Sequence, residues 1–277
     1  MKLIDFEETK KVELGILKEF ADFCEENNLS YFLAYGTLIG AIRHKGFIPW
    51  DDDVDVWMPR PDYDKLKELF NSQRKNSNYI VVSPHEKVSR HSIVKIIDKR
   101  TEKSEKGVDY KYGVLGVDID VFPLDGQPED DCVYEAWYNK LQKIYRRHFV
   151  LISQAPTAFI PKMKYMVKLA IIRAIHITKK NILKKAEKNH KKYSYNDSKY
   201  VGAVESWSNS RSNRYNKDWF SEAVLVDFEG YKFKAPIGYH EILSKMYGDY
   251  MKIPTAEKRV SHHTSKAYWK EDDNEKV

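Results

Sequence analysis

Hydrophobic residues in the first part of the chain recur at the spacing of a helix. Val12, Ile16, Phe20 and Phe23 follow one another at three- and four-residue steps, which places their side chains on one face of a helix. The pattern therefore predicts an amphipathic helix that ends near Asn27.

The next segment changes to the pattern of a short strand and a turn. Residues 31–35 are largely apolar, as in a buried strand, and Gly36 and Thr37 follow directly. Apolar residues within 38–42 then predict a helical turn. A glycine turn between a strand and a helix start presents backbone N–H groups that can bind a phosphate.

Alternation of acidic and apolar residues predicts two further strands. In the first, Asp53 and Asp55 fall on one face, and the valines between and after them fall on the other. The second, predicted over 114–122, repeats this alternation with Asp118 and Asp120. Each strand therefore presents a pair of carboxylates on a single face.

The rest of the chain predicts a mixture of helices and strands. The predicted elements are helices over 62–70, 129–150 and 162–192, strands at 81–82 and 93–97, and a hairpin around 228–231. Pro59 and Pro61 are expected to end the first acidic strand, and Pro123 the second, before a turn at 124–126. The polar stretch 99–106 predicts a mobile loop. The fold class is therefore α/β, with a mixed sheet of the α+β kind and a long basic amphipathic helix.

The composition is that of an ordinary folded protein. Of the 277 residues, 42% are hydrophobic and 32% are charged, which excludes collagen-like and disordered classes. The two cysteines, Cys24 and Cys132, fit neither a disulfide framework nor a zinc-ligand spacing. The charged start of the chain and the absence of an uncharged 18-residue run predict a cytoplasmic protein that does not span a membrane.

Positive charge gathers in one segment. The whole chain has a net charge of +6, whereas residues 162–192 contain 11 Lys or Arg and one acid, Glu187, for a local charge of +10. A basic amphipathic helix of this kind can lie on the inner, anionic surface of a membrane. The alternative is a packed helix with a solvated basic face. No nucleic-acid-binding motif is present, so nucleic acid is not an expected partner.

Residues 31–66 combine the glycine turn with the first acidic pair. Two carboxylates on one strand face can hold one or two hard cations such as Mg²⁺, which neutralise phosphate oxygens during transfer. A calcium loop is excluded by spacing, because Val56 stands where an EF-hand requires glycine. An acid from the second pair could complete the metal site or accept a proton from a hydroxyl group.

Basic residues near these acids are candidate phosphate contacts. Arg43, His44 and Lys45 could neutralise a pyrophosphate or form a solvated turn. Lys95 lies in an apolar strand and could contact a phosphate or mark a sheet edge. A further cluster that could line a site or form a solvated tail consists of Glu257, Arg259, His262 and His263.

The motifs resemble those of the LicD family of phosphocholine transferases. The matching stretches are Gly36-Thr37-Leu38, residues 43–53 and Met58-Pro59-Arg60, with weaker similarity at 121–125 and 243–254. The resemblance implies a nucleotidyltransferase-like core in which a CDP-activated alcohol donates its phospho-alcohol group to a glycan hydroxyl and CMP is released. For choline, an aromatic cage is also expected.

The resemblance also implies roles for individual residues. Gly36 and Thr37 would contact the donor phosphates, Asp53 and Asp55 would bind Mg²⁺, and Asp120 would be the third acid and the base. Asp118 shares the face of Asp120, so the choice between these two acids stays open. Two Mg²⁺ ions are expected, with Mn²⁺ as the alternative.

The resulting hypothesis assigns a role to each part of the chain. Residues 1–128 form the catalytic core, 129–235 a helical and partly basic insertion for the acceptor or a membrane, and 236–277 a segment that returns to the core. The enzyme would transfer phosphocholine from CDP-choline to a sugar hydroxyl of a lipid-linked teichoic acid precursor of the cell wall. The alternatives are a nucleotidyltransferase that acts on a small hydroxyl compound and a non-catalytic membrane-surface module.

Overall fold

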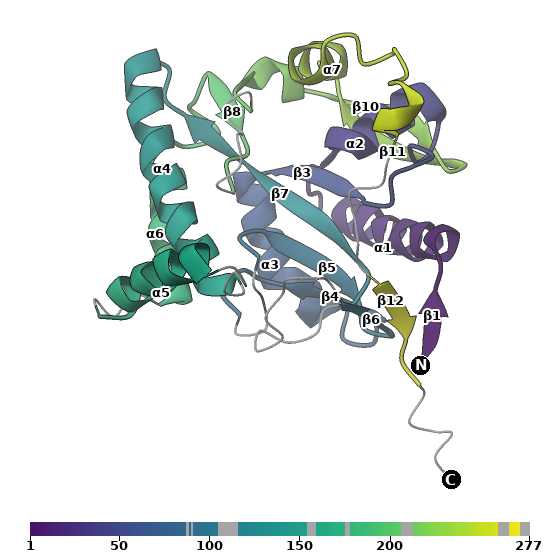
Figure 1. Ribbon diagram of the computed structural model, residues 1–277. Coiled ribbons are helices and arrows are strands. Elements are labelled where there is room, and N and C mark those ends of the chain that lie inside the picture. Colours follow the sequence, from purple (N-terminus) through teal and green to yellow (C-terminus); the bar gives the residue numbers. More distant parts are fainter. Residues whose placement is uncertain are drawn as a thin grey trace.

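A mixed β-sheet forms the centre of the molecule (Figure 1). The computed structural model describes residues 1–86, 89, 91–104, 116–153, 159–174, 178–205, 213–259 and 266–271. The strands lie in the order β2 (Phe32–Leu33), β3 (Asp55–Pro59), β7 (Asp118–Gln127), β5 (Val94–Asp98) and β4 (Tyr79–Val82). β3 and β7 are parallel, and the other neighbours in this order are antiparallel. The predicted α/β class with a mixed sheet is confirmed.

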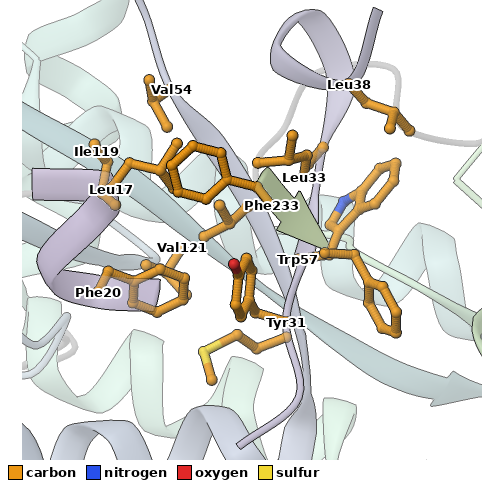
Figure 2. Close-up of a cluster of buried hydrophobic side chains, with 14 of the residues drawn as sticks. Leu17, Phe20, Tyr31, Leu33, Leu38, Val54, Trp57, Ile119, Val121 and Phe233 are labelled. Carbon is orange, nitrogen blue, oxygen red and sulfur yellow. The ribbon is translucent and has the colours of Figure 1, made fainter. Parts of the chain in front are cut away.

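Two helices cover one face of this sheet. They are α1 (Phe6–Glu26) and α3 (Arg60–Gln73), and they pack on each other through Phe23 and Phe70, whose ring centroids are 4.8 Å apart. Figure 2 shows Leu17 and Phe20 of α1 beside Ile119 and Val121 of β7. The apolar half of the alternation in β7 thus forms the core, and Asp118 and Asp120 point to the opposite face.

Smaller elements surround the sheet. Beyond the central strands, β8 (Tyr200–Gly202) pairs with the end of β7, and β9 (Tyr215–Asn216) pairs with β8. Above the acid-bearing strands lie α2 (Tyr35–Ile39), a π-helical turn over Gly40–His44, the hairpin β10 (Ala223–Phe228) and β11 (Tyr231–Pro236), and α7 (Tyr239–Tyr247) (Figure 1). The hairpin prediction is confirmed, since Phe228 pairs with Tyr231.

The helices α4 (Asp131–Ile152), α5 (Phe159–Ala174) and α6 (Lys179–His190) lie together on one side of the molecule (Figure 1). Single turns of 3-10 helix cover Lys217–Phe220 and Ala256–Lys258. Of the helices in the described ranges, none is long and apolar enough to cross a membrane. The predicted division at residues 128 and 235 stays a prediction, and the middle segment holds strands β8 to β11 as well as helices.

The prediction of a mobile loop over 99–106 is wrong for the part that the structure describes. Thr101–Ser104 forms strand β6, which pairs with β12 (Lys266–Trp269), and β12 also pairs with β1 (Lys2–Ile4). The partner strand comes from the far end of the chain. The local polar sequence therefore gave no sign of this three-stranded sheet.

Pro123 does not end its strand, as the sequence pattern had predicted. β7 continues to Gln127. It pairs with β5 through residues 118–121 and with β8 through residues 125–127. Pro123 lies between these two partners, where the missing N–H interrupts no ladder hydrogen bond.

The predicted single helix over 162–192 is two helices, α5 and α6. Thr178 has an extended backbone, and its hydroxyl accepts a hydrogen bond from Asn181 N at 3.2 Å, so it caps the start of α6. The amphipathic pattern continues across this break, but a residue that caps a new helix cannot also be the interior of a longer one.

Candidate active site

Three charged side chains lie in one row across the central sheet. Asp55 of β3 is opposite Asp120 of the parallel strand β7, and Asp120 is opposite Lys95 of β5. Lys95 Nζ lies 2.5 Å from Asp120 Oδ1 and also contacts Asp118. Residues from three separate parts of the sequence therefore meet on one face of the sheet.

The two acids of β7 differ in their electrostatic surroundings. Lys103 Nζ lies 3.3 Å from Asp118 Oδ1. Although burial opposes ionisation, Lys103 and Lys95 together hold the pKa of Asp118 below its usual range. For Asp120, burial and the neighbouring charge of Asp118 outweigh Lys95 and raise its pKa. Asp118 is thus the better neutralised member of the pair.

Asp55 is more deeply buried than Asp120, the acid opposite it. It is 9% exposed. Burial, followed by the like charges of Asp53 and Asp120, raises its pKa well above the usual value, and Lys95 offsets this in part. A cation placed beside Asp55 and Asp120 would relieve the repulsion between them.

These carboxylates have the chemistry of a site for a hard cation. Oxygen ligands from Asp side chains are those that Mg²⁺ prefers. Among the described residues, however, no three His, Cys, Asp or Glu side chains are gathered closely enough to hold a metal ion as they lie. The argument for a metal site therefore rests on the carboxylate ligands and on their buried excess of negative charge, and bound Mg²⁺ stays a prediction.

Thr37 fixes the strand that carries the first acidic pair. Its hydroxyl accepts a hydrogen bond from Asp55 N at 2.8 Å and lies 3.4 Å from the carbonyl oxygen of Asp53. A Cβ at Gly36 would lie 2.8 Å from Asp51 Oδ2. The turn and the acidic segment are thus packed tightly together. The phosphate contacts of Gly36 and Thr37 stay predictions.

Arg43, His44 and Lys45 lie at the end of the π-helical turn. Arg43 donates hydrogen bonds to His44 Nε2 at 2.9 Å and to the carbonyl oxygen of Tyr250 at 2.7 Å. The carbonyl oxygen of Lys45 accepts a hydrogen bond from Glu229 N at 2.9 Å. Arg43 therefore joins this turn to the segment after α7, and Lys45 joins it to the hairpin, while their roles toward a phosphate stay predictions.

The C-terminal cluster is described only in part. Glu257 is exposed, and the guanidinium carbon of Arg259 lies 5.5 Å from the centre of the Trp50 ring. This contact brings the segment close to the acidic loop, since Trp50 directly precedes Asp51. His262 and His263 lie outside the described residues.

Comparison with known proteins identifies the family of this chain. Residues 28–169 match the family described as "LicD/FKTN/FKRP, nucleotidyltransferase domain". The chain is 33% identical over 273 residues to the lipopolysaccharide cholinephosphotransferase LicD of Haemophilus influenzae. The aligned region covers 97% of this chain and 99% of the relative. The chain belongs to the LicD family. An uncharacterized protein of Rickettsia prowazekii is 37% identical over 54 residues, or 20% of each chain.

Two further groups that the sequence interpretation did not select lie near the acidic row. Tyr247 of α7 is 45% exposed. Loss of hydration, followed by the charges of Asp55, Asp51 and Asp53, raises the pKa of its hydroxyl, so this hydroxyl lies near the acids. Tyr247 belongs to the weakly similar block near the C-terminus, and that block was the signal that could have found it.

A buried acid from α1 also lies near the acidic row. Glu13 is fully buried, and neither of its carboxylate oxygens has a hydrogen-bond partner among the residues that the structure describes. Burial raises its pKa, and its electrostatic neighbours are Lys103, Asp118 and Asp53. In the sequence, Glu13 interrupts the apolar face of the first helix, and this interruption could have marked Glu13 as unusual.

Proposed function

We propose that this protein transfers phosphocholine from CDP-choline to a sugar hydroxyl of a lipid-linked surface glycan, with release of CMP. The observation that carries the proposal is the row of Asp55, Asp120 and Lys95 across three strands. The similarity over almost the whole chain to a protein named as a lipopolysaccharide cholinephosphotransferase supports the choice of phosphocholine.

In the proposed reaction, the acceptor oxygen attacks the phosphorus that carries choline. The bond from that phosphorus to the CMP oxygen breaks, and CMP leaves. Asp120 accepts the proton of the acceptor hydroxyl, a role favoured by a pKa raised through burial and the charge of Asp118. Lys95 holds Asp120 in place through its ion pair and keeps one positive charge on this face of the sheet.

Asp53, Asp55 and Asp120 would hold Mg²⁺ in this proposal. When bound, the ion supplies a Lewis acid that orients the diphosphate and neutralises its charge. Thr37 supports this arrangement because its hydroxyl fixes the backbone of Asp55, and Tyr247 lies over the same acids from α7. In this proposal, Thr37 and Tyr247 support the donor site from two different elements.

The acceptor is proposed to reach the enzyme at a membrane surface. An exposed apolar stripe runs along α5, where Ile160, Met163, Val167 and Ile171 are each between 52% and 59% exposed. Exposed lysines, Lys162, Lys164 and Lys168, lie between these apolar residues. An apolar stripe beside basic side chains is suited to the interface of an anionic membrane.

A turnover assay tests the proposal. Purified protein with Mg²⁺ and CDP-choline is expected to release CMP only when a glycan acceptor is added, and label from choline should appear on the acceptor. Teichoic acid precursors and lipopolysaccharide are the two acceptor classes to compare. Release of pyrophosphate from a nucleoside triphosphate would instead indicate a nucleotidyltransferase, and no turnover with either donor would overturn the enzymatic proposal.

A sedimentation assay with anionic phospholipid vesicles tests the membrane surface separately. Replacing both Met163 and Val167 with serine is expected to reduce binding by about thirtyfold or more, since each buried apolar side chain contributes roughly 1 kcal/mol or more. Leu225 of β10, which is 65% exposed, offers a matched control. Equal loss in the Leu225→Ser protein, or no loss in the α5 variant, would contradict the proposal.

A further inference from the structure

A cavity of about 260 Å³ lies directly beside the acidic row. Its wall includes Asp120 and Phe122 of β7, Tyr145 and Phe149 of α4, and Glu205. This volume is just below the range of about 300–1,000 Å³ that is usual for pockets holding drug-sized ligands. The cavity is thus suited to one end of a nucleotide-alcohol donor and too small for the whole molecule.

Two of the aromatic side chains that line this cavity are held in place by contacts outside it. The Phe122 ring packs edge-on against Tyr35, with ring centroids 5.1 Å apart. The Tyr145 hydroxyl lies 2.8 Å from His190 Nε2. Phe149 is 45% exposed. Two fixed rings and one exposed ring therefore surround the space next to Asp120.

The charges on the wall favour a cation. None of the described residues that line the cavity is Lys or Arg, and two are acids: Asp120, which pairs with Lys95 from outside this lining, and Glu205. Glu205 is 7% exposed, and its Oε1 has no hydrogen-bond partner among the described residues. A buried carboxylate oxygen without a partner is costly, and a bound cation would compensate it.

The protonation of the wall agrees with this reading. His91 and His148 also line the cavity. Burial, followed by the charge of Lys179, lowers the pKa of His148 to about 4, so the His148 ring is neutral at pH 7. Burial raises the pKa of Glu205 to about 8. A cation in the cavity would restore the charge of Glu205, and the neutral His148 ring would not repel that cation.

We infer that this cavity binds the trimethylammonium group of the donor, with Phe122, Tyr145 and Phe149 as aromatic walls and Glu205 as the counter-charge. A quaternary ammonium cannot donate a hydrogen bond, so it is recognised by aromatic faces and by a carboxylate nearby. The inference rests on the proposed phosphocholine transfer. It names Glu205 and Phe149 as the residues that select choline over uncharged alcohols.

Calorimetric titration of CDP-choline and of CDP, both with Mg²⁺, tests the inference without requiring turnover. CDP contains the nucleotide and the diphosphate but lacks the ammonium group. The Kd of CDP-choline is expected to rise about tenfold in Glu205→Gln and about threefold in Phe149→Ala, the scale of cation–π and ion-pair contributions. The Kd of CDP should stay within about twofold in both.

Two controls separate this result from general damage. Tyr231 of the hairpin is 44% exposed, so Tyr231→Ala matches Phe149→Ala in size and exposure and should leave both Kd values unchanged. Thermal unfolding shows whether Glu205→Gln is folded, and Phe149→Ala tests the cavity at a surface position. Equal changes for CDP and CDP-choline, or no change for CDP-choline, would overturn the inference. Absence of CMP release by the wild type, with these Kd differences intact, would overturn the proposed function alone.

Discussion

Two buried carboxylate clusters on strand β7 differ in how completely their charge is paired. At Asp125, Arg60 donates two hydrogen bonds of 2.6 Å, one to each carboxylate oxygen, and His190 Nδ1 lies 3.2 Å away. Despite burial, Arg60 and then His190 hold the pKa of Asp125 below its usual range. Five residues earlier, Asp120 faces Asp55, and both pKa values are raised.

This difference indicates a structural role for the paired cluster at Asp125 and a ligand-binding role for the acidic row. A buried carboxylate that is paired on both oxygens holds elements together, here the start of α3, the end of β7 and the end of α6. Carboxylates that repel one another in the interior lower stability, and proteins retain such groups where a ligand compensates them. The acidic row is therefore the part of this sheet to which we assign binding and catalysis in the proposed function.

The largest expected effect is on turnover at the acidic row. We expect Asp55→Asn and Asp120→Asn each to lower kcat/KM by about 10²–10³-fold, the usual effect of removing one preorganised electrostatic group. Asp227→Asn, on the exposed hairpin, serves as the control and should stay near wild type. Near-normal CMP release by either the Asp55→Asn or the Asp120→Asn protein would contradict the proposed role of that acid in turnover.

The second effect is on stability at the paired cluster. Arg60→Ala leaves Asp125 buried without its main partner, so the free energy of unfolding should fall by about 3–5 kcal/mol. Arg74 provides a matched control, because it bonds Glu19 and Glu26 at 2.7 Å each but lies nearer the surface. For Arg74→Ala a loss of about 1 kcal/mol or less is expected. Similar losses for the two variants, measured by urea denaturation, would contradict the distinction.

A smaller effect of opposite sign is expected for Asp55→Asn in metal-free buffer. Because the folded-state pKa of Asp55 lies above its unfolded value, the native state binds more protons between those two values, and stability falls there as pH rises. Removing this carboxylate should therefore raise the free energy of unfolding, by about 1.4 kcal/mol for each unit of pKa shift.

The pH dependence gives the measurement for this prediction. The stability advantage of Asp55→Asn over wild type should increase as pH rises from the usual Asp pKa toward neutrality. The depressed pKa of Asp125 has the reverse consequence, since its stabilisation is present above the unfolded pKa and is lost in acid. Urea denaturation at several pH values that shows Asp55→Asn to be less stable than wild type throughout would refute this account.

Local patterns in the sequence were sufficient for the acids but not for their neighbours. The alternation around Asp55 and Asp120 predicted that each lies on a polar strand face, and the structure has both on the same face of one sheet. The register that sets Asp55 opposite Asp120 depends on pairing between strands more than 60 residues apart. A pattern with a period of two residues contains no information on that pairing.

Contacts between distant elements could not be predicted. Lys95 was selected as a candidate phosphate contact, but its ion pair with Asp120 depends on the order of strands in the sheet. Glu205 and Phe149 stand in segments without a recognisable motif, and they reach the cavity only through the packing of α4 beside β7. A fully paired acid such as Asp125 and an acid with excess negative charge around it such as Asp120 cannot be told apart in sequence.

Binding of Mn²⁺, followed by electron paramagnetic resonance, tests most directly whether the acidic row is a cation site. Wild-type protein with CDP-choline is expected to bind Mn²⁺, and the Asp227→Asn control should bind it equally. The Asp55→Asn, Asp120→Asn double variant is expected to bind at least about tenfold more weakly, because two anionic ligands are lost. Equal Mn²⁺ affinity in the double variant and the wild type would contradict the assignment of this row as the metal-binding centre.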